Sequence, residues 1–421
     1  MNKIKLNATS LSFLPILVFI PIAYQLIINL HFNGFSLFKE FLVSAFNPEI
    51  NNETIFILIK RLNETIFIAF SSWSISILFG VIFGILTSNI FYKIFNLPIL
   101  VKRIITLFLT LIRSIHEIIW GLILMQLYGI NFTIGIIAIS IPSIAINSKV
   151  FAEQLNNIDS KTFESIKYLN GPKFSSLITL IWNPIIDTFY NFGEYRLECA
   201  IRSSVILGLF GIGGIGTSIF LSFQTLNFRE LWTYLWGLAL LIAICKEVFK
   251  KIRFKKFNIN ISFFLVSIIF TIILFSLSFF LNFIFKNYSL TTQILNNLFN
   301  SNSYSISFDF FRLIFETIIL SLSSAAIAIS FPPILMLIFK NKHDHIFIRS
   351  LFFILRLIPT PILILALLTF NNPSISLASL TLGLHNSGIT GKLLFVNLRN
   401  QDNKDYIAMR SLGVSKRISW I

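Results

Sequence analysis

The fold is decided by residues 64–91, which read ETIFIAFSSWSISILFGVIFGILTSNIF. A helix needs about 20 predominantly apolar residues to cross the hydrocarbon core of a bilayer. The stretch exceeds that length, and its one charged side chain, Glu64, stands at its first position. It therefore predicts a helix that spans a membrane.

The composition of the whole chain points the same way. Of its 421 residues, 55% are hydrophobic, 15% aromatic and 12% charged, and the mean hydropathy is +0.80. Soluble domains average about 25% charged residues, so a water-facing surface is excluded, as are disorder, a coiled coil and an ordinary nucleic-acid-binding domain. Two cysteines, Cys199 and Cys245, give neither a disulfide framework nor a metal-ligand spacing. We expect an all-α integral membrane protein with no nucleic-acid partner.

We expect ten spans in all, with turn and helix-stop residues between most of them. Their approximate bounds are 11–30, 64–91, 104–127, 132–150, 183–210, 231–248, 260–285, 312–339, 347–370 and 374–394. A signal peptide is the alternative for the first, because Lys3 and Lys5 precede it. Its apolar run is too long for a signal peptide and no small-residue cleavage site follows, which favours an uncleaved span.

The basic residues, which give the chain a net charge of +16, predict the orientation of the spans. With a cytoplasmic amino terminus, the cytoplasmic segments hold 24 of the 34 Lys and Arg residues and the outer segments hold six. Such a bias is typical of cytoplasmic loops, so we expect the amino terminus inside. The basic run at 250–256 is either a topology anchor between two halves or a site for anionic lipid.

The chain repeats itself at an offset of 243 residues. Arg113-Ser-Ile115 matches Arg356-Leu-Ile358, and the polar segment from Lys149 to Lys173 matches that from Lys392 to Lys416. Matching Lys, Asn and Asp residues inside a polar loop is a stronger signal than matching Leu or Phe. We therefore expect a first repeat of six spans at 1–250 and an incomplete second repeat of four spans at 251–421. The chain is then expected to be a fragment, or a decayed copy, of a twelve-span parent.

A polar segment after the fourth span resembles the EAA loop of ABC importer permeases. It begins Phe151-Ala152-Glu153, runs through Asp159 to Asn170-Gly171-Pro172-Lys173, and ends near Asn183-Pro184. In that family the loop is a short cytoplasmic helix–turn–helix that docks on the ATPase subunit. The resemblance implies an ATPase-coupling loop at about 151–184 and a second one at about 394–421. The coupling residues that it implies are Ala152, Glu153, Asp159, Asn170, Gly171 and, in a second copy without the acid, Gly413.

A more specific stretch lies at 195–216 and reads YRLECAIRSSVILGLFGIGGIG. It resembles the signature of phosphonate ABC permeases, Tyr-Arg-x-Glu-x-x-x-Arg followed by Leu-Gly-x-x-Gly-x-Gly-Gly-x-Gly. Arg113-Ser-Ile-His116-Glu117 resembles that family's Arg-x-Ile-Pro-Glu, with His116 in place of the proline. Together these stretches imply a fused double permease with the methionine-importer-type fold and about ten transmembrane helices in two repeats.

The resemblance implies the membrane subunit of a bacterial inner-membrane importer for phosphonate, phosphite or a related phosphorus oxyanion. Its expected partners are an ABC ATPase dimer, a periplasmic substrate-binding protein and membrane lipid, with no cofactor, metal or catalytic site of its own. A permease for methionine or glycine betaine, and an ion-coupled secondary transporter, are the alternatives. The motif Gly211-x-Gly213-x-x-Gly216 also matches a dinucleotide fingerprint, but no βαβ unit fits between two spans.

Charged residues at membrane depth are costly, so each one needs a partner or a water-filled path. Arg113 and Glu117, like Glu198 and Arg202, are spaced i, i+4 and are expected to pair on one helix face. Two interpretations stay open, a polar lining for an anionic substrate and structural ion pairs within the bundle. For the first, the candidate residues of a substrate path are Arg113, Glu117, Glu198, Arg202 and Arg356.

Overall fold

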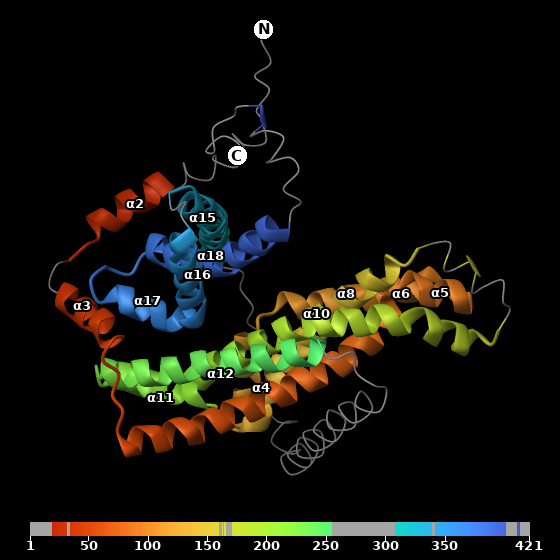
Figure 1. Cartoon of the computed structure of the whole chain (residues 1–421), viewed down its shortest axis with the longest axis horizontal. Helices are drawn as coiled ribbons and strands as arrows, with labels where there is room; N and C mark the ends of the chain where they lie inside the picture. Colours follow the sequence, from red (N-terminus) through yellow and green to blue (C-terminus); the bar gives the residue numbers. More distant parts are fainter. Residues whose placement is uncertain are drawn as a thin grey trace, which may run out of the picture. The chain divides into compact units, whose positions relative to one another are not determined.

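The computed structural model describes residues 19–31, 34–159, 162, 164–165, 171–254, 308–338, 342–400 and 411–412. Within these ranges the regular elements are α-helices, together with an isolated bridge between Leu30 and Asn371. The all-α prediction is therefore confirmed. The chain divides into two compact units, Met1–Asn47 with Ser303–Ile421 (unit 1) and Pro48–Asn302 (unit 2). Figure 1 shows the helices of both units.

Unit 2 is organised around one long helix, α4, which packs along α8 and also contacts α10, α11 and α12 (Figure 1). Its described helices are α4 (Asn52–Thr87), α5 (Asn89–Phe95), α6 (Ile99–Ser114), α7 (Glu117–Tyr128), α8 (Phe132–Asn156), α10 (Lys173–Leu209), α11 (Ile215–Gln224) and α12 (Phe228–Phe254).

Small residues bring α4 and α8 close together. A Cβ added at Gly80 would lie 2.6 Å from the Cβ of Asn147, and one at Gly84 would lie 2.7 Å from the Cβ of Phe151. Since Gly80 and Gly84 meet successive turns of α8, the two helices run parallel. The Asn147 side-chain amide donates a hydrogen bond of 3.2 Å to the hydroxyl of Ser76. Small side chains and hydrogen bonds between helices are the usual glue of membrane bundles.

Unit 1 repeats this arrangement with α15 packed along α18. A Cβ added at Gly383 would lie 2.6 Å from the Cβ of Ile327, and the Thr390 hydroxyl donates to the carbonyl of Ala328 at 2.6 Å. The described helices of unit 1 are α2 (Phe19–Ile28), α3 (Phe35–Ser44), α15 (Phe308–Ile338), α16 (Lys342–Leu357), α17 (Thr360–Leu368) and α18 (Ile375–Asn400).

The 243-residue offset of the predicted repeat also relates the first residues of the helices in the two units. The first residues of α6 and α16, of α7 and α17, and of α8 and α18 are each 243 positions apart. The same order of elements, a long helix, a broken pair and a second long helix, therefore occurs once in each unit.

The amino-terminal helices pack with the second of these copies. The side-chain amide of Asn371 donates to the carbonyl of Leu26 at 2.9 Å, and the backbone N–H of His31 donates to the carbonyl of Phe370 at 3.0 Å. The first repeat predicted from the sequence includes residues 1–47, whereas the structure groups Met1–Asn47 with Ser303–Ile421.

Within the described residues, four helices are long and apolar enough to cross a membrane, and they coincide with the predicted spans 64–91, 132–150, 231–248 and 312–339. They cover Asn52–Thr87, Phe132–Asn156, Phe228–Lys251 and Phe310–Met336. The predicted spans 183–210 and 374–394 fall within α10 and α18. Span 260–285 lies outside the described residues, and span 11–30 is described only from residue 19.

Two predicted spans, 104–127 and 347–370, are wrong as single helices. The first is α6 and α7 with a bend of 84°, and the second is α16 and α17 with a bend of 94°. Ile115 and His116 adopt extended backbone between α6 and α7, and the ring of His116 accepts a hydrogen bond from the N–H of Ile118. Pro359 occupies the corresponding cap of α17, where proline prevents the preceding helix from continuing.

The close approach of α4 to α8 yields a first prediction. Gly84→Val should destabilise the protein by about 1–3 kcal/mol, because the added side chain overlaps Phe151 and a packed interface must shift to admit it. Gly171→Ala is the control, since a Cβ there would have its nearest neighbour, Ser176 Oγ, at 3.6 Å. Thermal unfolding of both variants in detergent is the measurement. Equal midpoints for the two variants would contradict the packing argument.

Candidate functional site

The predicted coupling loop is described at its two ends. Residues 151–156 continue α8 without a break, so the first half of the expected helix–turn–helix is the end of a long helix. Ala152 is buried there, whereas Glu153 is exposed and lies 3.6 Å from Lys149 in an i, i+4 pair. Asp159 and Gly171 are exposed, and Asn170 and Gly413 lie outside the described residues.

An apolar cluster ties both ends of this loop to α5. Leu155 at the end of α8 packs with Leu177, Leu180 and Ile181 at the start of α10 and with Ile90 of α5. The backbone N–H of Asn89 also donates to the side-chain carbonyl of Asn156 at 2.7 Å. The two described ends of the loop are therefore packed together against α5.

Helix α10 connects these packed ends to the glycine-rich stretch. It runs without interruption for 37 residues and contains Pro184. At its far end, Gly211, Gly213 and Gly214 adopt φ angles of 93°, 109° and 81°, which residues with a side chain rarely adopt. A Cβ at Gly216 would lie 2.0 Å from the carbonyl oxygen of Val205, so the start of α11 lies directly against the end of α10.

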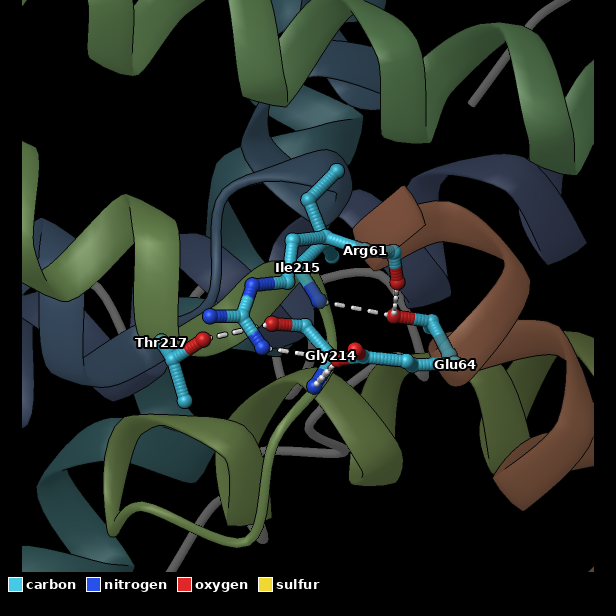
Figure 2. A network of polar contacts seen from close by, with 6 residues as sticks. Arg61, Glu64, Gly214, Ile215 and Thr217 are labelled. Atoms are coloured by element: carbon cyan, nitrogen blue, oxygen red, sulfur yellow. Dashed lines mark hydrogen bonds and ion pairs between the residues drawn. The ribbon is translucent and has the colours of Figure 1, made fainter. Parts of the chain in front are cut away.

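Side chains of α4 close the amino-terminal end of α11 (Figure 2). A carboxylate oxygen of Glu64 accepts hydrogen bonds of 2.9 Å from the backbone N–H of Gly214 and from the guanidinium of Arg61. The Thr65 hydroxyl accepts from the N–H of Ile215 at 2.8 Å. The first N–H groups of a helix lack partners within the helix and carry partial positive charge, so this acid and hydroxyl form a cap supplied by another helix.

The second half of α10 carries a buried charge cluster. Glu198 is 4% exposed, and its carboxylate lies 3.0 Å from the guanidinium of Arg202 and 3.3 Å from the ammonium of Lys246 on α12. The carboxylate of Glu198 therefore pairs with two cationic side chains. The predicted pairing of Glu198 with Arg202 is present, and Lys246, which was not predicted to take part, joins it from α12.

Two further polar contacts join α10 to its neighbours. The Arg196 guanidinium donates to the hydroxyl of Ser143 on α8 at 2.7 Å, and the Ser203 hydroxyl donates to the carboxylate of Glu117 on α7 at 2.7 Å. Arg196 and Ser203 thus each have a polar partner on a different helix, which offsets the cost of placing them in an apolar surrounding.

The expected pair of Arg113 and Glu117 on one helix face is wrong. Arg113 lies in the last turn of α6 and Glu117 begins α7, and the 84° bend between the two helices removes the i, i+4 geometry. Arg356 stands at the matching end of α16 in unit 1, where it is 5% exposed and packs against Gly388.

Arg61, Glu64 and Thr65 were not predicted as part of the site, because residues 64–91 were interpreted only as a membrane span. The position of Glu64 on the first turn of that span was the available signal. The break at His116 was not predicted either, although Pro359 stands at the matching position of the repeat.

The cap on α11 is expected to contribute to stability. Glu64→Ala leaves the N–H of Gly214 without its acceptor and should cost about 1–3 kcal/mol. Glu53→Ala, on the exposed first turn of the same helix, should change stability less. The midpoint of thermal unfolding in detergent measures both. A larger loss from Glu53→Ala would show that Glu64 is not the cap.

The charge cluster gives a third prediction. Glu198→Ala leaves Arg202 and Lys246 without their acid and should cost about 3–5 kcal/mol, seen as loss of protein from membrane fractions. The triple variant Glu198→Leu, Arg202→Met and Lys246→Met should recover much of that loss, because all three charges of the cluster are then replaced by apolar groups. Lys250→Ala, at an exposed pair, is the control. If Glu198→Ala accumulates normally, the cluster is not structural.

No family model matches the chain. It is 26% identical over 132 residues to the phosphite transport system permease protein PtxC of Stutzerimonas stutzeri, covering 31% of this chain and 48% of that protein. It is 24% identical over 147 residues to the putative phosphite transport system permease protein HtxE of the same organism, covering 35% and 56%. The chain thus spans about half the length of these curated relatives.

Among solved structures, one described as an inward-facing conformation of the MetNI methionine ABC transporter is similar at a TM-score of 0.45 and 16% identity. The similarity covers 48% of this chain and 97% of the other. The relatives named above are permease proteins, and the apolar helices of this chain are those of a multi-pass membrane protein.

Proposed function

We propose that the chain is a membrane-spanning subunit of a bacterial ABC importer that moves phosphonate, phosphite or a related phosphorus oxyanion across the inner membrane. The observation that carries the proposal is its similarity to phosphite transport permeases. The arginine and glycine stretch at 195–216 supports it, because these residues form one connected assembly at the end of α10 and the start of α11.

In this proposal the chain is a fused double permease. The common offset of 243 residues between α6 and α16, α7 and α17, and α8 and α18 supports two copies of one permease architecture. The chain itself is not an enzyme, and a separate ATPase dimer hydrolyses ATP. A periplasmic binding protein delivers the substrate to the outer face, and the amino terminus is cytoplasmic.

In this proposal the uninterrupted helix α10 couples the ATPase-docking loop to the buried charges and the glycine loop. Its first turns pack at the described ends of the coupling loop, and its last turn lies against the glycine loop about 55 Å away, at 1.5 Å per residue. A packed helix moves as a rigid element, so a displacement of the loop by the ATPase reaches the buried charges and α11 directly. Such motion of packed elements switches access between the two sides of a transporter.

The proposed substrate path uses Arg113, Glu117, Glu198, Arg202 and Arg356. In unit 2 the cluster of Glu198, Arg202 and Lys246 carries one net positive charge, which attracts an oxyanion. Because Glu198 already pairs with both Arg202 and Lys246, the cluster attracts the oxyanion only moderately. A moderate affinity for the substrate allows its release. Tight recognition then belongs to the binding protein.

The fourth prediction tests the coupling loop. Glu153→Lys reverses the charge of an exposed residue and should abolish stimulation of the partner ATPase while the protein still inserts into membranes. Glu247→Lys is a matched control, because Glu247 is also an exposed acid with a nearby lysine but lies on α12. The measurements are ATP hydrolysis and uptake of phosphite in proteoliposomes with the partner subunits. Full stimulation by Glu153→Lys would refute the docking role, and uptake of methionine in place of phosphite would refute the substrate class.

A further inference from the structure

Helix α6 is packed against the bundle of unit 2 along only a narrow part of its surface. Leu109 is its buried residue, whereas the apolar side chains of Ile104, Leu107, Phe108 and Leu111 are 59% to 64% exposed. Most of the apolar surface of α6 is therefore open to whatever surrounds the unit.

A groove of about 490 Å³ runs along one exposed face of this helix. Its lining residues recur every three or four positions, as one helix face requires, and they include Lys102, Arg103, Thr106, Leu107, Thr110 and Leu111. At 1.5 Å per residue, Leu111 lies about 12 Å along the helix axis from Arg103. The groove therefore has a cationic end near the start of α6 and an apolar end further along.

Neighbouring elements position the cationic end. The ammonium of Lys102 donates a hydrogen bond to the side-chain carbonyl of Asn89, and the backbone N–H of Asn89 donates to Asn156 at the end of α8. Arg103 is exposed, and it has no acidic partner among the residues that the structure describes. A fixed ammonium and an available guanidinium thus stand at successive positions.

The two threonines of the groove have hydrogen-bond partners within α6. The Thr106 hydroxyl donates to the carbonyl of Lys102 at 2.8 Å, and the Thr110 hydroxyl donates to the carbonyl of Thr106 at 2.7 Å. Neither hydroxyl needs a partner from another molecule. A hydrocarbon chain can therefore lie along Leu107 and Leu111 without leaving a buried donor unpaired.

The cation pair is not a requirement of the repeated helix arrangement. His345 and Ile346 stand on α16 at the positions that match Lys102 and Arg103 at the offset of 243 residues. The adjacent ammonium and guanidinium are thus a feature of unit 2.

We propose that this groove binds an anionic phospholipid, with the headgroup phosphate at Lys102 and Arg103 and one acyl chain along Leu107 and Leu111. A guanidinium forms two parallel hydrogen bonds with phosphate oxygens, and the exposed leucines gain an apolar cover. A free anion uses only the cationic end and a neutral apolar molecule only the other end, whereas an anionic phospholipid matches both.

The leaflet follows from the contacts of Asn89. Because Asn89 bonds to the last residue of α8, the cationic end lies at the same end of unit 2 as the predicted coupling loop. The proposed function places that loop in the cytoplasm, where the negative surface potential of the inner leaflet attracts basic side chains. The choice of leaflet rests on the proposed function, whereas binding of the lipid does not.

The fifth prediction concerns photo-crosslinking to lipid. The full chain, carrying p-benzoylphenylalanine in place of Leu111, is reconstituted in mixed vesicles of phosphatidylcholine and phosphatidylglycerol. Phosphatidylglycerol should form adducts about tenfold more often than its share of the vesicle lipid, because two cations attract its phosphate. The same probe at Ile329, an exposed position on α15, is the control and should form adducts in proportion to the vesicle composition. Mass spectrometry of the adducts is the measurement.

Charge variants of the same probe-bearing chain test the cationic end. Arg103→Gln, which removes no described ion pair, should lower the enrichment of phosphatidylglycerol about threefold. Lys102→Gln combined with Arg103→Gln should abolish the enrichment. Lys250→Gln combined with Lys251→Gln removes the same charge from the end of α12 and should leave the enrichment unchanged.

Several outcomes would overturn the proposal. They are adducts that follow the vesicle composition, adducts with the chain itself in place of lipid, no adduct, and an equal loss of enrichment in the two double variants, which would indicate general attraction to basic residues. Inorganic phosphate in millimolar excess should leave the enrichment unchanged, and its loss would make the cationic end a site for free oxyanions instead. None of these measurements requires transport, so a failure of the proposed function would leave their results intact.

Discussion

The structure depends on the close parallel contact between α4 and α8. Gly80 and Gly84 permit it, since a single added Cβ at either position would overlap α8. Once α4 is fixed there, its other faces receive α10, α11 and α12, and Glu64 and Thr65, about three turns from its start, cap the end of α11. Unit 1 has the same contact between α15 and α18, with Gly383 in the corresponding role. Without this approach of the two helices, neither the glycine loop nor the charged cluster would have a scaffold.

The buried polar groups extend this scaffold. In an apolar surrounding an unpaired charge is costly, and the described bundle of unit 2 meets that cost by pairing groups from different helices. Glu198 of α10 forms an ion pair with Lys246 of α12, and the hydroxyl of Ser203 on α10 donates a hydrogen bond to Glu117 of α7. The charged residues that the sequence marks as unusual in a membrane span are therefore the ones that fix how α10 sits among its neighbours.

Much of this could be predicted from the sequence, for definite physical reasons. Apolar length located the spans on α4, α8, α12 and α15, and the 243-residue offset anticipated the positions of helix starts. Pairing of Glu198 with Arg202 followed from their spacing on one continuous helix.

The features that sequence reasoning missed depend on contacts between distant segments. Hydropathy averages over a window, so it joined α6 to α7 across a bend that the backbone at His116 creates. Spacing along one helix cannot show that Lys246 approaches Glu198, or that Glu64 meets Gly214 from 150 residues away. The coupling loop and the substrate path stay predictions, because they concern partners and ions.

The packing of α2 against the loop before α18 has a consequence for biosynthesis. Leu26 and Asn371 are joined by a hydrogen bond across 345 residues of sequence. A ribosome adding roughly 5–20 residues per second needs about 20–70 seconds to make that intervening chain. Throughout this interval α2, with Ile20, Tyr24 and Ile27 facing outward, lacks its final neighbours, while the contacts within unit 2 can already form. Helix α2 is thus made well before α18 and reaches its native contacts only after α18 has been made.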